Sequence, residues 1–336
     1  MHIDTAREVK ANVWRSVCDE VAIQSEQPGV PGFLGLSVKG PGRFGVAVRY
    51  RDDGGGALAR RAAELAGDDA DIREIGAVRH LAAVSPTAAG GLSQWRPEQL
   101  QRRVRPLHPG LSIGQRHVSA GTLAAFVALA DRAGVFMLSN NHVLADSDRA
   151  RVGDPVLQPG PADKGSATDR VGHLARFVHL SSTGSHTVDA AVAQLDPGKS
   201  GEADRTAVDT RYPSGSLTGV AELTDEDWPA DEVLVEKVGR TTGVTRGRVT
   251  AIELDAVTVE YPIGAVTFDN QIEVTGADGA FSGGGDSGAL VYRPDTMQAV
   301  GLLFAGSERG GVDGTGLTYC NPIGLVLEAL GATLVL

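Results

Sequence analysis

The sequence predicts a mainly β protein, and three observations support this fold class. Apolar runs of about four to eight residues alternate with Gly-, Pro-, Asp- and Ser-containing turns from Ile113 onward. Glycine accounts for 44 of the 336 residues, whereas aromatic residues make up only 5%. Few segments show the apolar periodicity of a helix. Abundant turns with few helices are typical of antiparallel barrels and sandwiches.

The first part of the chain, residues 1–85, is predicted to form a small α/β N-terminal domain. Residues 4–23 read as a helix, because four valines recur at every fourth position: Val9, Val13, Val17 and Val21. Strands are expected at 33–40, 43–50 and 72–78, with a second helix at 57–66. The valine stripe would suit packing against a second copy, so we consider a homo-oligomer formed through this domain.

The rest of the chain divides into a connecting segment and a main domain. Residues 86–109 are polar and contain prolines, which predicts a linker or wrapping arm. Residues 110–336 carry the alternating apolar runs, among them TLAAFVAL, DAAVAQL, VLVEKVG, RGRVTAIEL and AVGLLFAG. Regular spacing of such runs indicates an antiparallel barrel or sandwich. Apolar residues on one helical face predict a C-terminal helix at about 321–330.

Charge and composition exclude several classes of partner. The formal net charge is -11, with 31 basic against 42 acidic residues, so nucleic acid is not expected as a partner. No stretch of about 18 apolar residues occurs, so no membrane partner is expected either. The two cysteines, Cys18 and Cys320, are too few for a disulfide framework, and the acidic N-terminal residues do not resemble a secretory signal. We therefore expect a cytoplasmic protein.

The run GGGDSGALVY contains the sharpest chemical motif. Ser287 stands between Asp286 and Gly288, after a glycine run and before an apolar strand. A nucleophilic serine needs its hydroxyl beside backbone N–H groups that can bind a carbonyl oxygen, and glycines permit the backbone conformations that this requires. The pattern therefore predicts a nucleophile at Ser287. The alternative is a glycine-rich hairpin with a serine in its turn.

Two further polar residues stand at the ends of apolar strands. In VFMLSNNHVLAD, His142 is flanked by apolar residues that would fix its ring, as a general base requires. In TVDAAVAQL, Asp189 opens an apolar strand, where a carboxylate is costly unless it is paired. A histidine Nδ1 proton is a natural partner for it. The alternatives are a structural histidine and a solvent-facing aspartate.

The three candidates occur in the order His142, Asp189, Ser287, which is the chymotrypsin order and differs from those of α/β-hydrolases and subtilisins. The motifs SNNHVLA, DAAVAQL, VEKVGRTTGVTRGRV and GGGDSGALV resemble the chymotrypsin-like (trypsin-like) serine peptidases, most closely the narrow-leaf-type proteases of plants and their bacterial relatives. The resemblance covers about residues 104–330. It implies a double antiparallel β-barrel, with barrel 1 at about 110–198 and barrel 2 at about 230–320.

The resemblance also implies a role for each residue of the motifs. Ser287 would be the nucleophile, His142 the general base and then the general acid, and Asp189 the group that orients His142. The backbone N–H groups of Gly285 and Ser287 would form the oxyanion hole. Asp286 would pair with an arginine or a turn, and not with a newly cut N-terminus.

Four further residues are candidates for substrate binding. Residues 301–307 resemble the strand that pairs with the substrate backbone, which brings in Phe304, Ala305 and Gly306. Phe281 stands where trypsin-like enzymes carry an acidic residue at the floor of the specificity pocket. Specificity for lysine or arginine is therefore not expected.

Together these residues predict a serine endopeptidase that cleaves protein or peptide substrates through an acyl-enzyme and needs no cofactor. No metal site is expected, because His173, His179 and His186 lack a cysteine partner and a flanking carboxylate pattern. Two alternatives stay open. One is a catalytically quiet or partner-activated module that keeps the fold for binding or regulation. The other is an inactive precursor released by cleavage near residues 86–109.

Overall fold

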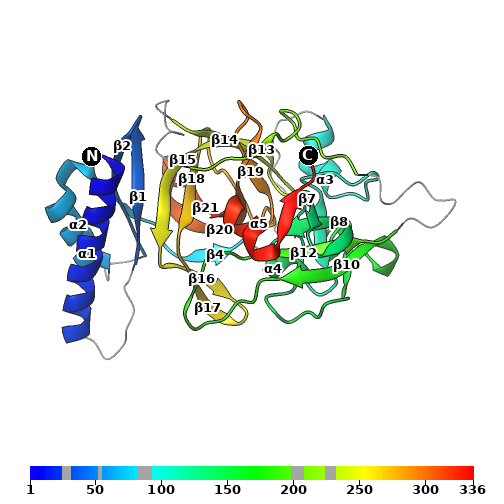
Figure 1. The fold of residues 1–336 in the computed structure, drawn as a ribbon, viewed down its shortest axis with the longest axis horizontal. Coiled ribbons are helices and arrows are strands. Elements are labelled where there is room, and N and C mark those ends of the chain that lie inside the picture. Colours follow the sequence, from blue (N-terminus) through cyan, green and yellow to red (C-terminus); the bar gives the residue numbers. More distant parts are fainter. Residues whose placement is uncertain (25–31, 52–54, 82–92, 198–207, 224–231) are drawn as a thin grey trace.

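The structure, a computed structural model of the chain, describes residues 1–24, 32–51, 55–81, 93–197, 208–223 and 232–336, without the side chains of residues 18–24. Figure 1 shows three parts along the long axis: an α/β unit in blue, a closed β-barrel in yellow to red, and a half-barrel in green. The closed barrel lies between the other two.

The closed barrel is a ring of six antiparallel strands in the order β14-β15-β18-β21-β20-β19. Their bounds are β14 Leu234–Gly239, β15 Gly243–Asp255, β18 Gln271–Gly276, β19 Leu290–Tyr292, β20 Gln298–Gly310 and β21 Gly316–Pro322. A hairpin, β16 Val257–Tyr261 and β17 Gly264–Phe268, follows β15. Because every strand of the ring pairs on both sides, the ring leaves no free edge.

The half-barrel is an open antiparallel sheet in the order β22-β7-β8-β12-β10-β9-β5-β6. Its strands are β5 Ser112–Gln115, β6 Gly121–Thr122, β7 Ala125–Leu129, β8 Arg132–Ser139, β9 Pro155–Leu157, β10 Arg170–Phe177, β12 Ala191–Leu195 and β22 Ala332–Leu334. Helix α5, Ile323–Leu330, buries Ile323, Val326 and Leu330 in its core, and β22 then pairs with β7. The C-terminal segment therefore joins the closed barrel to the half-barrel.

Shorter elements complete the two barrels. β11, Ser185–His186, pairs with β17, and β13, Gly219–Val220, pairs with β20. Helix α3, Pro97–Leu100, places Leu100 in the core of the half-barrel, and Leu107 lies in the same core. Of the expected linker, residues 86–92 lie outside the described residues, and the later part packs as an arm on the half-barrel.

The α/β unit contains α1 Ile3–Gln24, β1 Gly32–Gly40, β2 Arg43–Tyr50, α2 Gly56–Ala66 and β3 Ala70–Glu74. β2 and β3 are parallel and are connected through α2. Val13 and Val17 of α1 are buried against residues of β1, β2 and α2, whereas the side chain of Val21 is not described. These valines thus pack inside the chain and do not offer a surface to a second copy. A homo-oligomer through this domain stays a prediction, but the valine stripe does not support it.

The α/β unit shares its sheet with the closed barrel, because β1 pairs antiparallel with β15. A buried charge network joins the same parts. Arg49 of β2 donates from Nε and Nη2 to Glu273 of β18 at 2.6 and 2.8 Å, and Nη2 also donates to Asp71 at 2.8 Å. Neither side chain of the Arg49–Glu273 pair is exposed to solvent.

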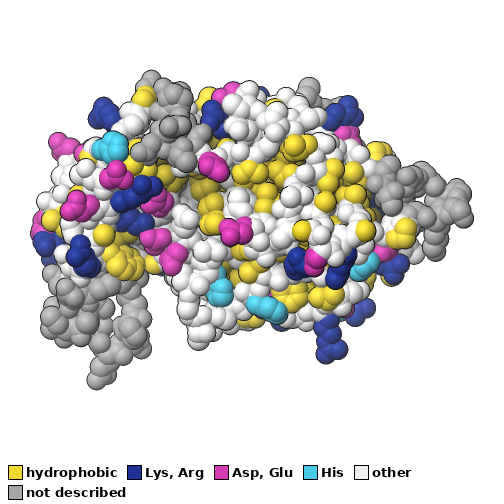
Figure 2. Space-filling view, viewed as in Figure 1, with side chains coloured by type: hydrophobic (Ala, Val, Ile, Leu, Met, Phe, Trp, Pro, Cys, Tyr) yellow, Lys and Arg dark blue, Asp and Glu magenta, His cyan; other side chains and the backbone are white. Residues whose placement is uncertain are grey.

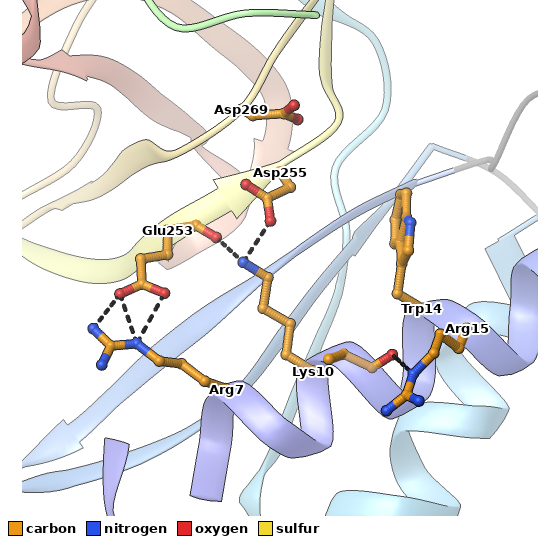
Figure 3. Close-up of a pocket in the computed structure, with 8 residues that line it drawn as sticks. Arg7, Lys10, Trp14, Arg15, Glu253, Asp255 and Asp269 are labelled. Atoms are coloured by element: carbon orange, nitrogen blue, oxygen red, sulfur yellow. Dashed lines mark hydrogen bonds and ion pairs between the residues drawn. The ribbon is translucent and has the colours of Figure 1, made fainter. Parts of the chain in front are cut away.

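A second, open junction lies between α1 and the end of β15 (Figure 3). Arg7 and Lys10 point from the helix toward the strand, where they form ion pairs with Glu253 and Asp255, both at 2.6 Å. The groove beside them has a volume of about 500 Å³. In Figure 2, charged side chains gather on the face at this end of the molecule. Surface pairs of this kind orient two parts more than they stabilise them.

Strand β4, Val78–His80, lies between the hairpin and the closed barrel (Figure 1). It pairs antiparallel with β20 and parallel with β16. The single strand predicted at 72–78 is therefore wrong, because β3 ends at Glu74 and β4 begins at Val78 with different neighbours. Gly76 has a positive φ of 66°, which allows the chain to turn away from the α/β sheet between them.

The predicted fold class is confirmed. The protein is mainly β, and its closed antiparallel barrel and half-barrel match the chymotrypsin-like double-barrel arrangement, with a small N-terminal α/β unit and a C-terminal helix. The residue boundaries expected between domains stay predictions. None of the helices in the described ranges is long and apolar enough to cross a membrane.

We expect Arg49→Met to lower the free energy of unfolding by about 3–5 kcal/mol, because Glu273 would stay buried without its cation. Urea unfolding followed by circular dichroism measures this. The control is Arg61→Met, which breaks an exposed ion pair with Glu64 and should cost less than about 1 kcal/mol. Equal losses in the two variants would contradict the assignment.

Candidate active site

The loop at residues 283–288 holds Ser287 in a conformation that requires glycine on both sides. Gly285 and Gly288 have positive φ values of 99° and 89°. A Cβ on Gly288 would stand 2.0 Å from Ser139 Oγ and 2.4 Å from the backbone oxygen of Thr122, and the second clash could be relieved only by moving the backbone. The glycines therefore set the loop against the strand that leads to His142.

The buried carboxylate of Asp286 fixes this loop through hydrogen bonds. It accepts a hydrogen bond from Lys237 Nζ at 3.0 Å, and neither side chain is exposed. It also accepts bonds from the backbone N–H groups of Thr241, Thr242 and Gly283, at 2.8, 3.2 and 3.0 Å. Burial lowers the pKa of Lys237, and attraction to Asp286 opposes that shift. Of the two partners expected for Asp286, an arginine or a turn, the structure shows the turn at residues 240–242, and the cation is a lysine of β14 in place of an arginine.

Thr122 of the half-barrel fixes the same loop from the other side. Its N–H donates to the carbonyl oxygen of Ser287 at 2.7 Å, and its hydroxyl donates to that of Gly285 at 2.9 Å. Its own carbonyl accepts a bond from Ser139 Oγ at 2.8 Å. One threonine therefore links the serine loop of the closed barrel to the strand before His142.

His142 lies on the short helix α4, Asn141–Leu144, which begins where β8 ends. Its Nδ1 is 2.5 Å from Asp189 Oδ2, and both side chains are buried. Asn140 donates from Nδ2 to the Asp189 carbonyl at 2.8 Å, and the Asp189 N–H donates to Asn321 Oδ1 at 2.9 Å. The structure thus brings the predicted imidazole and carboxylate into direct contact.

Tyr261 supplies a further bond to this carboxylate, donating its hydroxyl to Asp189 Oδ2 at 2.7 Å. Burial alone would raise the pKa of Asp189, but attraction to His142 and hydrogen bonds from His142 and Tyr261 hold it below its ordinary value. Burial and the charge of Asp189 raise the pKa of Tyr261, so its hydroxyl stays protonated and remains a donor. Asp189 is accordingly an anion at neutral pH.

The hydroxyl of Ser287 is turned toward β20 and not toward His142. It donates to the carbonyl oxygen of Phe304 at 3.3 Å, and the carbonyl oxygen of Leu81 lies 3.5 Å from the same Oγ. His142 Nε2 is buried and has no hydrogen-bond partner among the described residues. The predicted nucleophile and base therefore share one site without the bond that would complete a triad.

Of the other predicted residues, Gly285 and those of β20 lie beside Ser287, whereas Phe281 lies in the core of the closed barrel. The N–H of Gly285 donates to the carbonyl oxygen of Leu81 at 2.7 Å, which places that expected oxyanion donor beside the Ser287 hydroxyl. Phe304, Ala305 and Gly306 lie on β20, where the last two pair with β4. Phe281 is fully buried in the core of the closed barrel.

Sequence reasoning missed three residues of the site. Tyr261 and Asn321 hold Asp189 through its side chain and its backbone, and neither stands in a distinctive motif. Lys237 gave a signal that could have been used, because it is a charged residue inside the apolar run LVEKVG. A charge in such a run needs a buried partner, and Asp286 is that partner.

The histidines considered for a metal have other partners. His173 lies 3.1 Å from Asp196, and His179 lies 3.0 Å from Asp148. His186 contacts Ser181 through its ring. Over the described ranges, no group of three or more ligating side chains could hold a metal ion.

No family model matches the sequence, and no curated protein matches it. Solved structures of chymotrypsin-like serine proteases do align with the chain. Protease A of Thermobifida fusca is 20% identical, covers 68% of this chain and 98% of its own, and has a TM-score of 0.44. The Nocardiopsis protease is 19% identical, covers 68% of this chain and 99% of its own, and has a TM-score of 0.46. The Cellulomonas bogoriensis chymotrypsin is 20% identical, covers 68% of this chain and 98% of its own, and has a TM-score of 0.43.

We expect Tyr261→Phe to lower the free energy of unfolding at pH 7 by about 1.5–3 kcal/mol, because it removes a hydrogen bond to a charged group. The pKa of Asp189 lies below its ordinary 3.8, so this stabilisation is present above about pH 4 and disappears as the pH falls through the lowered pKa. Unfolding in urea at a series of pH values measures the difference.

The matched control for that series is Tyr212→Phe, whose hydroxyl donates to the neutral carbonyl of Ala124 at 2.8 Å. The free energy of unfolding that this variant loses should lie in the ordinary range for a neutral hydrogen bond. That loss should not change between pH 3 and pH 7. A Tyr261→Phe difference that is equally independent of pH would show that Asp189 is not the group stabilised.

Proposed function

We propose that the protein is a serine endopeptidase of the narrow-leaf type, with Ser287, His142 and Asp189 as its catalytic triad. The observation that carries the proposal is the meeting of a buried His142–Asp189 pair with a backbone N–H, that of Gly285, already bound to a peptide carbonyl beside the Ser287 hydroxyl. A base, an orienting anion and an oxyanion donor around one hydroxyl are what acyl transfer requires.

The residues divide the reaction between them as follows. Rotation about the Cα–Cβ bond of Ser287 would move Oγ from Phe304 toward His142 Nε2, which has no competing partner among the described residues. Oγ then attacks the substrate carbonyl carbon while Nε2 takes the hydroxyl proton. Asp189 stabilises the imidazolium that results and keeps Nε2 free to accept a proton.

The later steps use the same groups in reverse. His142 returns its proton to the amine that leaves, and the acyl group stays on Ser287 as an ester. Water then attacks the ester carbon while His142 takes one of its protons. His142 passes that proton to Ser287 Oγ as the ester bond breaks, which releases the carboxylic acid and restores the serine hydroxyl. The N–H of Gly285, with that of Ser287, would bind the oxyanion at both tetrahedral stages. No cofactor is needed by this sequence of steps, and the cytoplasmic location stays a prediction.

We expect Ser287→Ala to abolish peptide cleavage, because no other group supplies the attacking oxygen. For the same reason, a fluorophosphonate probe should not label this variant even in a reaction long enough to label the wild type completely. Asp189→Asn should keep the fold but lower kcat by about 10⁴-fold, because it favours the wrong tautomer of His142. The control is Ser166→Ala, an exposed serine of the half-barrel.

Two outcomes would remove the proposal. Labelling of Ser287→Ala at the wild-type level would assign the reactive hydroxyl elsewhere. A folded chain that neither labels nor cleaves, both as the wild type and as Leu81→Asp, would favour the alternative, a protease fold kept for binding or regulation.

A further inference from the structure

A segment of the same chain lies beside Ser287, and we call the place that it occupies the cleft. β4 lies antiparallel to β20, with Ala305 opposite His80, Gly306 opposite Arg79 and Ser307 opposite Val78. The pairing continues toward the N-terminus, where the N–H of Arg309 donates to the carbonyl of Ile75 at 3.1 Å. An extended peptide added to a sheet edge is a general mode of peptide recognition, in which backbone bonds give affinity and pockets give selectivity.

The end of this segment meets the chemical groups of the site. The carbonyl oxygen of Leu81 accepts the Gly285 N–H at 2.7 Å and lies 3.5 Å from Ser287 Oγ. The ring of the preceding residue, His80, lies 5.1 Å from the ring of His142. Two consecutive residues therefore contact the proposed oxyanion donor, nucleophile and base, in the direction that presents the Leu81 carbonyl to Ser287.

Each side chain of the segment has a distinct environment. Val78 is fully buried in an apolar cluster that includes Phe304, whereas Arg79 is exposed and forms an ion pair with Glu308 at 3.3 Å. His80 stacks on Tyr261 at 5.3 Å and donates from Nδ1 to the carbonyl of Glu260 at 2.9 Å. Val78 is thus held by apolar packing and His80 by stacking and a hydrogen bond, while Arg79 between them faces solvent. Such alternation is typical of an extended peptide bound beside a strand.

Leu81 packs in apolar surroundings beside Gly306, which we call its pocket. It is half-buried and packs against the cluster of the closed barrel that contains Phe281. A Cβ added to Gly306 would stand 3.2 Å from Leu81 Cδ2, so the missing side chain of Gly306 makes room for the leucine. No cation of the segment enters this pocket, since the neighbouring Arg79 faces solvent.

We propose that residues Val78–Leu81 bind the active-site cleft as an internal, substrate-like inhibitor, and that the cleft is therefore selective for extended peptides with leucine as the residue whose carbonyl is attacked. This inference rests on the proposed peptidase function of Ser287. It adds to that function the class of substrate and the means by which the enzyme is inhibited. The inhibiting residues are 78–81, which precede the linker at 86–109 where activating cleavage was considered.

The burial of the site supports inhibition and not turnover of the segment. Ser287 and His142 are only 1% and 6% exposed, so an outside peptide cannot reach them while the segment is bound. The Ser287 hydroxyl donates to Phe304, and His142 Nε2 accepts no proton from it. Attack on Leu81 thus lacks its base in this arrangement, and the segment stays bound.

We expect Leu81→Asp, which places a charge in the apolar pocket, to be labelled by a fluorophosphonate probe on the order of ten-fold faster than the wild type or more. The physical reason is that the reactive fraction of the enzyme rises when the closed state loses its anchor. Leu81→Gly is a second, milder variant, and Arg79→Ala is the matched control because its side chain faces solvent. Measurable labelling at the same rate in the wild type and in both Leu81 variants would overturn the proposal.

A binding measurement separates this inference from the catalytic one. The full chain carrying Ser287→Ala and Leu81→Asp is titrated by calorimetry with the free peptide Ile-Gly-Ala-Val-Arg-His-Leu, the sequence of residues 75–81. We expect binding here, and none to Ser287→Ala alone, whose cleft its own segment fills. Absence of binding to the double variant overturns the inference. Binding without labelling of any variant keeps the inference about the cleft and rejects the peptidase function.

The pocket can be tested through its glycine. We expect Gly306→Ala, made in the Leu81→Asp chain, to lower the ratio of kcat/KM for leucine substrates to kcat/KM for alanine substrates by about 10-fold. The added methyl group would stand where the end of the leucine side chain packs. Peptide libraries varied at that position measure the ratio. A parent chain that prefers lysine, arginine or aspartate there, or a ratio unchanged by Gly306→Ala, would contradict the assigned selectivity.

Discussion

The buried ion pair between Lys237 and Asp286 is the interaction on which the site depends. Both side chains are fully removed from solvent, which is costly for either one alone. The cost is offset because Asp286 also accepts three backbone N–H bonds. These bonds fix the loop that carries Gly285 and Ser287 without any chain terminus or disulfide. The position of the proposed nucleophile is therefore set by a strand distant in sequence.

The cleft is made by the junction of the two barrels, and each side supplies a different part. The half-barrel contributes the His142–Asp189 pair, and the closed barrel contributes Ser287 and the strand β20. Thr122 bonds across the junction to the serine loop. The α/β unit reaches the same place through β4, so the part of the chain furthest from the half-barrel in Figure 1 sends a strand to the cleft.

Much of the fold could be predicted because local patterns specify it. The alternating apolar runs became the strands of both barrels, and the VGRTTGV run became the hairpin of β14 and β15. The strand predicted at 72–78 was wrong because apolar character alone does not say which neighbour a strand joins. β3 pairs within the α/β unit, whereas β4 pairs with β20, and Gly76 permits the change of direction.

The sequence by itself determined the fold class and which imidazole, carboxylate and hydroxyl were candidates, because strand periodicity and glycine placement are local properties of the chain. Only the tertiary structure decided that Tyr261 and Asn321 hold Asp189 and that Lys237 is the partner of Asp286. It also decided that Leu81 lies against the serine loop. Such contacts join residues far apart along the chain, and their geometry follows from how the barrels pack and not from any run of neighbouring residues.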